Sequence, residues 1–184
     1  MPAALLSKEE VLERLLATFR SDGYDGASLA ELSERTGLGK SSLYHHFPGG
    51  KAEMATAVLA HLEGVLGAAF SSALDAPTPQ AKLARLLDAV DAFYAGGKKA
   101  CILERLSASV DRARFKKPLA RAFDGFVSAF LEIGHAAGLR EAAARARAET
   151  AVVRIEGALV VAAGTGDTGV FTRTLGDLKA TFFA

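Results

Sequence analysis

The chain has 184 residues, half of them hydrophobic, and a formal net charge of +1 at pH 7. This length allows one large helical domain or a small domain joined to a larger one. The near-neutral balance excludes a protein that is basic over its whole surface. A single cysteine, Cys101, cannot form an internal disulfide and is consistent with a reducing compartment. The first residues lack a basic flank and no apolar run reaches membrane-span length, so we expect a cytoplasmic protein.

Apolar residues recur at three- and four-residue steps along most of the chain, and glycine and proline gather at a few breaks. This pattern predicts an all-α protein of about nine helices with no credible strand region. We expect a three-helix head over residues 1–50 and a helical body over residues 51–184. The helix after residue 50 should reach about 35 Å, long enough to connect the head to the body as a lever.

Capping signals define the helices of the predicted head. Ser7 with Glu10, and Ser28 with Glu31, have the spacing of a capping box, in which each residue bonds the other's backbone N–H. The helix that Ser28 begins should run to about residue 35. Gly37 then turns the chain with the positive φ that such a corner commonly needs. A second short helix is expected over about residues 39–47.

This second short helix has two different faces. At about 100° per residue, Leu43 and Phe47 fall on one side while Ser41 and His45 point away. Residues 1–34 contain three basic and seven acidic side chains, whereas residues 35–51 contain three basic side chains and no acid. A helix of this size fits a DNA major groove about 12 Å wide. We therefore interpret residues 28–51 as a DNA-binding segment whose positive charge is local.

The same residues carry a family resemblance. The matching positions are Phe19, Gly23-Tyr24, Ser28 to Leu32, Thr36-Gly37-Leu38, Leu43-Tyr44-His45-His46-Phe47-Pro48 and Lys51. Over about 45 residues, this run resembles the N-terminal helix-turn-helix of the tetracycline-repressor-like (TetR) family of transcriptional regulators. The rest of the chain resembles that family only in its helical layout.

The resemblance implies roles for eight side chains. Lys40, Ser41, Ser42 and His45 align with positions that address base edges, and Ser28, Tyr44, His46 and Lys51 align with positions that hold phosphates. Gly49-Gly50 replaces the single serine or threonine of many relatives, which puts the reach of Lys51 in doubt. Two alternatives stay open: His46 as a packing residue and Tyr44 as a core edge. Adjacent histidines point about 100° apart, so we expect no metal site and no cofactor here.

The body is predicted to hold a ligand cavity, because aromatic side chains can leave pockets between packed helices. The candidate residues of its wall are Phe93, Tyr94, Cys101, Leu103, Phe126 and Phe130. The candidate polar groups for binding a ligand are Arg154 and Glu156. The alternative is that these residues form plain core. Cys101 has two interpretations, a redox-sensing thiol or a small packing residue. The basic stretch of residues 112–118 is expected to lead into the seventh helix rather than to belong to it.

The last two predicted helices each carry an apolar strip. Their strip residues are Ala151, Val152, Ile155, Leu159, Phe171, Leu175, Leu178 and Phe182. Val153, Val160 and Val161 lie off the main strip, which indicates burial on more than one side and a partner from a second subunit. In the family that the chain resembles, these two helices form a four-helix dimer seam.

We therefore expect a ligand-relieved repressor that binds a palindromic operator as a homodimer and responds to a small apolar or aromatic effector. The alternative is a helical interaction or scaffold protein without DNA binding. An enzyme is not expected, because the four histidines are scattered or adjacent and no catalytic motif occurs.

Overall fold

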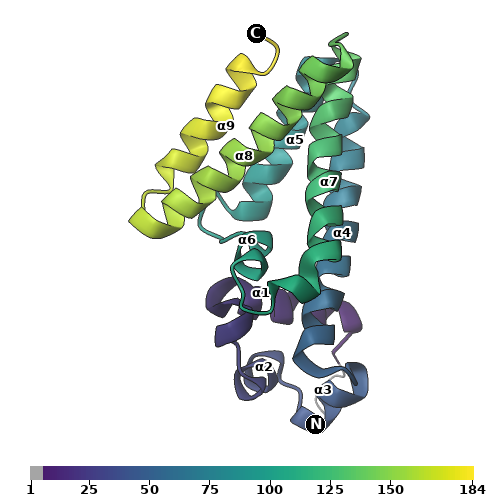
Figure 1. Cartoon of the computed structure of the whole chain (residues 1–184), viewed down its shortest axis with the longest axis vertical. Helices are drawn as coiled ribbons and strands as arrows, with labels where there is room; N and C mark the ends of the chain where they lie inside the picture. The colour runs from purple at the N-terminus through teal and green to yellow at the C-terminus, as the bar shows by residue number, and fades with distance from the viewer. Residues whose placement is uncertain (1–5) are drawn as a thin grey trace. The chain divides into compact units, whose positions relative to one another are not determined.

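A computed structural model describes residues 6–184, and within them it contains nine α-helices and no strand (Figure 1). The prediction of an all-α fold is confirmed. In chain order the helices are α1 (Lys8–Gly26), α2 (Leu29–Thr36), α3 (Lys40–His46), α4 (Gly50–Leu74), α5 (Pro79–Tyr94), α6 (Ile102–Ser107), α7 (Arg112–Ala136), α8 (Glu141–Thr165) and α9 (Gly169–Thr181).

The helices group into two compact units. The first unit comprises the chain up to Glu63 together with Ile102–Leu119. The second unit comprises Gly64–Cys101 and Ala120–Ala184. Helices α4 and α7 therefore contribute residues to both units. The domain boundary predicted near residue 50 stays a prediction.

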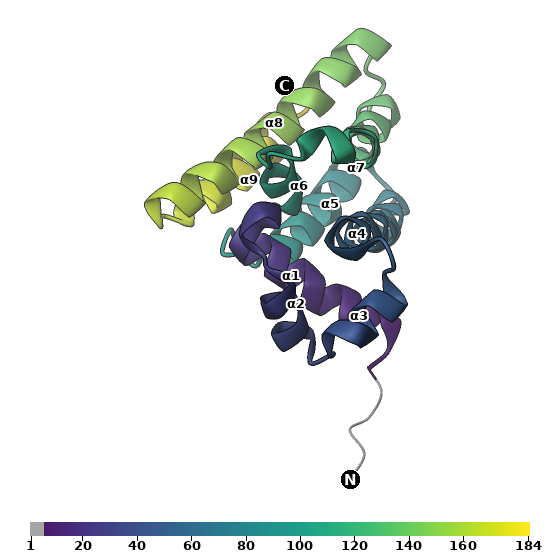
Figure 2. The ribbon, with the colours of Figure 1, turned by 60° about the horizontal axis from the view of Figure 1, so that its bottom comes forward.

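In the first unit, α1, α2 and α3 pack around one apolar core, and Figure 2 shows the three helices side by side. Both predicted capping boxes are present, Ser7 with Glu10 and Ser28 with Glu31. The start of α4 belongs to the same core. The fully buried side chains of this core include Leu15, Phe19, Leu32, Leu43, Met54, Val58 and Leu59.

Helix α4 is the one helix of the described residues whose length and apolar composition would allow it to cross a membrane. Polar residues such as Glu53, His61 and Glu63 interrupt its apolar sequence, so no uninterrupted apolar run indicated a membrane span here. Its first half lies in the core of the first unit, where Met54, Val58 and Leu62 are at most 1% exposed. This burial accounts for the apolar character of that half.

The seventh helix begins earlier than predicted. Residues 112–118 were expected to precede it, but α7 starts at Arg112 and contains Pro118. A proline inside a helix removes one backbone hydrogen bond. Phe115 and Leu119 flank Pro118 and are both buried, and the Phe115 ring meets Tyr24 with centroids 4.9 Å apart. We infer that this packing offsets the missing bond, which the local sequence did not show.

In the second unit, α8 and α9 form an antiparallel hairpin whose inner face packs on the rest of the unit (Figure 1). Aromatic rings of Phe70, Phe126, Phe130 and Phe182 make a continuous series, with successive centroids 5.3 to 5.8 Å apart. Such rings contribute large buried apolar areas. They form the core against which the hairpin is held.

Candidate nucleic-acid interface

The turn between α2 and α3 is fixed by local hydrogen bonds. Gly37 adopts the left-handed conformation, with φ 71°, as the sequence predicted for this corner. The Ser33 hydroxyl donates to the Leu38 carbonyl oxygen at 2.6 Å, and the Thr36 hydroxyl donates to the Leu32 carbonyl oxygen at 2.6 Å. A residue with a Cβ would be strained at Gly37. The turn therefore sets the direction of α3.

Helix α3 turns one side into the core and the other to solvent. Leu43 is fully buried and Phe47, directly after the helix, is 2% exposed. Six of the eight predicted DNA-contacting residues lie on α3 and all six are exposed: Lys40, Ser41, Ser42, Tyr44, His45 and His46. Tyr44 is 46% exposed, so it is not the core-edge residue of the alternative interpretation. His46 is also exposed, which speaks against a packing role. These side chains give α3 a ridge of hydrogen-bond donors and acceptors.

Ser28 lies at the start of α2 and is exposed. Its hydroxyl oxygen accepts from the Glu31 backbone N–H at 3.2 Å, and the Ser28 backbone N–H donates to Glu31 Oε2 at 2.8 Å. These bonds with the Ser28 backbone and side chain lower the pKa of Glu31. The Ser28 hydroxyl proton remains available to donate to an external oxygen. Its predicted phosphate contact is thus compatible with the capping geometry.

Lys51 differs from the other seven predicted residues. It is half-buried, and its Nζ donates to the carbonyl oxygens of Tyr24 at 2.9 Å and Ala27 at 3.1 Å. The ammonium also lies 4.5 Å from the centroid of the Tyr24 ring. The sequence reasoning did not predict this arrangement. Lys51 is directed at the end of α1.

Two acidic residues that the sequence reasoning did not single out also shape this region. The Glu53 carboxylate accepts from the Gly49 backbone N–H at 2.6 Å, at the start of α4. The Asp25 carboxylate accepts from the Ser109 hydroxyl at 3.1 Å and the Val110 backbone N–H at 3.0 Å. The position of Glu53 could have been recognised locally, because an acidic side chain in the first turn of a helix interacts favourably with the positive end of the helix dipole. The contact of Asp25 with Ser109 joins residues 84 positions apart, and no local sequence signal indicates it.

Tyr24 is a buried residue that contacts both Lys51 and Phe115. Its ring packs on Phe115 and stacks on Phe19 at a centroid distance of 6.1 Å. Burial raises the pKa of the Tyr24 phenol, the charge of Asp111 adds to this rise and the charge of Arg114 opposes it. Tyr24 therefore stays a neutral packing residue at physiological pH.

Residues 11–58 match the family described as "Bacterial regulatory proteins, tetR family". This segment, from α1 to the first part of α4, therefore carries the N-terminal domain of the TetR family. A curated relative, the HTH-type transcriptional regulator LmrA of Bacillus subtilis (strain 168), is 30% identical over 76 residues, which are 41% of this chain and 40% of that protein. The match thus spans about two fifths of the relative's length.

Solved structures of the TetR family share the fold over nearly the whole chain. A TetR transcriptional regulator from Legionella pneumophila has a TM-score of 0.87 at 17% identity, covering 97% of this chain and 99% of that one. The regulator CifR, as a cysteine mutant complexed with 26-bp double-strand operator DNA, has a TM-score of 0.63 at 22% identity, covering 100% of this chain and 94% of that one. At these identities the likeness shows the fold alone.

The predicted ligand-pocket residues are only partly brought together. Tyr94, Cys101 and Glu156 form one cluster, in which the Tyr94 hydroxyl donates to Cys101 Sγ and the Cys101 thiol donates to Glu156, both at 3.4 Å. The Phe93 ring lies beside Tyr94 at 4.9 Å. Phe126 and Phe130 belong to the buried aromatic series, as in the alternative of plain core, and Leu103 lies in the first unit.

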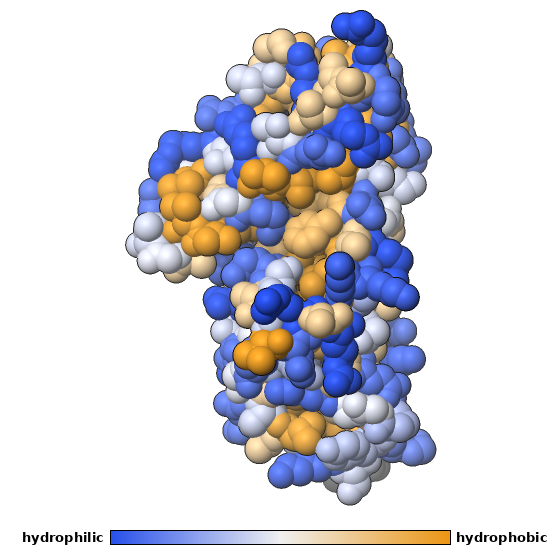
Figure 3. All heavy atoms as spheres, viewed as in Figure 1, coloured by the Kyte–Doolittle hydropathy of each residue, from blue (hydrophilic) through white to orange (hydrophobic). Residues whose placement is uncertain are grey.

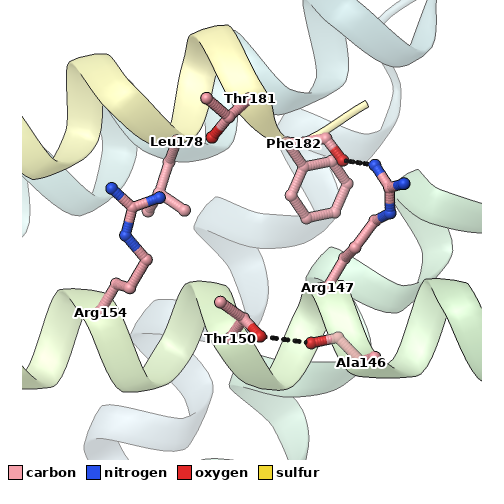
Figure 4. Close-up of a pocket in the computed structure, with 7 residues that line it drawn as sticks. All are labelled: Ala146, Arg147, Thr150, Arg154, Leu178, Thr181 and Phe182. Carbon is pink, nitrogen blue, oxygen red and sulfur yellow. Dashed lines mark hydrogen bonds between the residues drawn. The ribbon is translucent and has the colours of Figure 1, made fainter. Parts of the chain in front are cut away.

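Arg154, another predicted pocket residue, lines an open cavity of about 170 Å³ between α8 and α9. Figure 4 shows Arg154 and Arg147 at its two ends, with Phe182 and Leu178 between them. Arg147 donates to the Phe182 carbonyl oxygen at 2.7 Å, and Arg154 donates to Asp177 at 3.4 Å. The guanidinium groups therefore already have oxygen partners within the hairpin.

The eight predicted dimer-interface residues are all buried within the chain itself. Their exposed fractions are 7% or less for Ala151, Val152, Ile155, Leu159, Phe171, Leu175, Leu178 and Phe182. A side chain covered by its own chain has little surface left for a second copy. The large apolar residues that α8 exposes are Val153 at 70%, Val160 at 50% and Val161 at 44%. Figure 3 shows hydrophobic surface gathered over the α8–α9 hairpin.

The His45 and His46 rings have centroids 5.8 Å apart and are steeply inclined to each other. Within residues 6–184, no three His, Cys, Asp or Glu side chains are grouped so that they could hold a metal ion.

Proposed function

We propose that this chain is a transcriptional regulator that binds a palindromic DNA operator as a homodimer and releases it when a small apolar or aromatic molecule binds. The observation that carries the DNA-binding part is the division of α3: Leu43 is fully buried behind the helix while Lys40, Tyr44 and His45 are exposed on it. A regulator of this kind works in the cytoplasm.

The chemistry of α3 suits a duplex. Lys40 can donate to the guanine acceptors O6 and N7, while serine hydroxyls can pair with any base edge and discriminate weakly. Tyr44 and His46 are ordinary donors to phosphate oxygens. The absence of acids from residues 35–51 keeps repulsion from phosphates low. The operator-bound CifR structure, which has the same fold, supports this assignment.

The exposed valines of α8 support the homodimer. Val153, Val160 and Val161 form an apolar surface on a helix whose other side is already packed. Large exposed apolar surfaces mark interaction sites. A two-fold dimer through the α8–α9 hairpins would pair this surface with itself and supply two copies of α3 to one duplex, whose successive major grooves lie about 34 Å apart.

The release step needs little energy. A tenfold to hundredfold loss of operator affinity corresponds to about 1.4 to 2.8 kcal/mol of differential binding between two conformations. In the second unit, the rings of Phe93 and Tyr94 lie beside each other next to Cys101, and we expect the effector to contact this group. Arg154 offers a polar group at a cavity of the same unit.

Fluorescence anisotropy with a duplex of roughly 40 bp, selected by the wild-type protein from a random pool, tests DNA binding. We expect the affinity to fall steeply with salt, because phosphate contacts release counterions. Lys40→Ala combined with Tyr44→Ala should reduce the affinity by about a hundredfold, because two direct donors are lost. The thermal unfolding midpoint should stay close to that of the wild type, since both side chains are exposed.

If selection enriches no sequence and the double variant binds DNA as the wild type does, the chain is a helical interaction protein rather than a regulator. The effector step is tested separately, by titrating small aromatic and aliphatic molecules into the preformed complex. An occupied cavity in a crystal with no change in duplex affinity would remove the release step from the proposal.

A further inference from the structure

We infer that Lys51 is a positioning residue. Its side chain links the two ends of the helix-turn-helix and does not neutralise a DNA phosphate. This inference rests on the proposed DNA binding. It departs from the role that the resemblance implies for this lysine.

The end of α1 lacks a cation of its own. A helix carries partial negative charge at its C-terminal end, and basic residues in the last turn usually stabilise it. The last turn of α1 contains no basic residue. The chain leaves helical geometry at Gly23, where φ is 70° and ψ is 176°, and one further turn runs to Gly26. Lys51, from a different helix, brings its ammonium group to the carbonyl oxygens of this segment.

The contacts of Lys51 leave the ammonium little freedom to follow a phosphate. An ammonium has three N–H donors, and those to Tyr24 and Ala27 use two of them. The Tyr24 ring face at 4.5 Å adds a cation–π contact. Moving the ammonium to an external phosphate would leave two part-buried carbonyl oxygens without their donor, which is costly. The solvent-exposed Lys40 carries no comparable restraint.

The position of Lys51 in the chain gives these bonds a structural effect. Ser28, the first residue of α2's capping box, directly follows Ala27. At the other end of the motif, Phe47 N–H bonds Leu43 O at 2.8 Å and Gly50 N–H bonds Phe47 O at 2.8 Å, so α3 passes into α4 through one short turn. Lys51 is the next residue. Its side chain therefore joins the two ends of the α2–α3 segment and fixes α3 relative to the start of α2.

Salt dependence separates a phosphate contact from a positioning role. On duplex DNA, each phosphate neutralised contributes about 0.9 to the slope of log affinity against log salt. The full-length chain and its Lys51→Met, Lys51→Arg and Lys40→Met variants should be measured with the selected duplex, between about 50 and 200 mM salt. Thermal unfolding of each variant is followed by circular dichroism. Methionine keeps the length of the stem and removes only the charge and the donors.

For Lys51→Met we expect affinity about tenfold weaker at every salt concentration, an unchanged slope, and an unfolding midpoint lower by about 4–8 °C. Lys40→Met is the matched control and should keep the thermal stability of the wild type. If Lys40 contacts one phosphate, the slope of log affinity against log salt should fall by about 0.9. If Lys40 contacts only a base, the affinity should be weaker and the slope unchanged. A slope that falls by about 0.9 in Lys51→Met overturns the inference. So does a Lys51→Met protein with wild-type thermal stability.

Lys51→Arg decides the matter if the methionine variant does not fold. Arginine retains the charge and is an excellent phosphate ligand, but its planar group does not reproduce the bonds of a compact ammonium. We expect binding several-fold weaker than wild type with the slope preserved. Binding as tight as wild type, or tighter, would contradict a positioning role. Failure of the proposed function can be distinguished from failure of the Lys51 inference. If the wild-type chain binds no duplex, DNA binding is refuted before any variant is compared.

Discussion

Helix α3 and the α8–α9 hairpin both bury an apolar side, but α3 exposes polar side chains whereas the hairpin exposes apolar ones. Each has a fully buried apolar side, with Leu43 in α3 and Ile155 in α8 both at 0% exposure. On the outer side, α3 has only polar side chains apart from the phenol of Tyr44, whereas α8 exposes three valines. The buried residues therefore determine how each helix packs, and the exposed residues determine which kind of partner it can bind.

An outer surface of donors suits a polyanion, since each donor exchanges water for a phosphate or base oxygen. An outer surface of valines lowers its free energy only when a partner buries it away from water. A duplex and a second copy of the chain are therefore expected at different helices.

The largest effect is expected at the apolar surface. Replacing Val153 and Val160 together by glutamate should weaken the homodimer by at least about a hundredfold, because carboxylates would be buried without partners. Sedimentation velocity measures the dimer. Val110→Glu is the control, since Val110 is 85% exposed but lies outside α8 and α9. A double variant that remains as dimeric as the control places the interface elsewhere.

Neighbouring residues of α3 should separate stability from binding. Leu43→Ala should lower the free energy of unfolding by about 2–5 kcal/mol, as is usual for a fully buried leucine. Tyr44→Ala should leave it within about 0.5 kcal/mol and weaken duplex binding about tenfold. Urea unfolding and anisotropy measure the two quantities. Comparable stability losses in both variants would show that Tyr44 also holds the fold.

The negative charge at the start of α4 should oppose DNA. Glu53 accepts from Gly49 N–H beside the turn that follows α3. Glu53→Gln keeps an acceptor for this N–H and removes the repulsion, so we expect affinity about two- to threefold tighter at low salt. Glu149→Gln on α8 is the control and should not change the affinity. Weaker binding by Glu53→Gln would mean that the ionised cap is needed to shape the site.

The smallest effect concerns pH. Bonds with Ser28 lower the pKa of Glu31 in the folded chain. Its stabilising contribution is therefore present above the ordinary carboxyl pKa of about 4.3 and is lost as the pH falls through the lower folded value. In Glu31→Gln, the acid-dependent drop of the unfolding midpoint between about pH 5 and pH 3 should be slightly smaller than in wild type. An identical drop in both proteins would remove Glu31 from the acid response, with Glu34→Gln as the control.

Local signals made most of the head predictable. The capping boxes at Ser7 and Ser28 operate over three residues, and the positive φ of Gly37 follows from the turn in which it lies. The buried positions Leu43 and Phe47 follow from helical periodicity. For the same reason, the exposure of Lys40 and its polar neighbours could be anticipated from the sequence.

Contacts between distant residues could not be predicted in this way. The bonds of Lys51 to Tyr24 and of Asp25 to Ser109 join segments 27 and 84 residues apart. Pro118 suggested a boundary that tertiary packing overrides in α7. On α8, periodicity identified the valines that lie off the main strip, but it could not tell which of the two apolar sides the chain covers by itself.

The bond between Asp25 and the 109–110 turn bears on how this protein can be dissected. Residues 102–119 belong to the same compact unit as the helix-turn-helix, and Phe115 packs on Tyr24. A fragment that stops at Glu63 would uncover Tyr24 and leave the carboxylate of Asp25 without the Ser109 and Val110 donors. The DNA-reading part is thus not a portable module, and grafting it onto another protein requires both stretches of the chain.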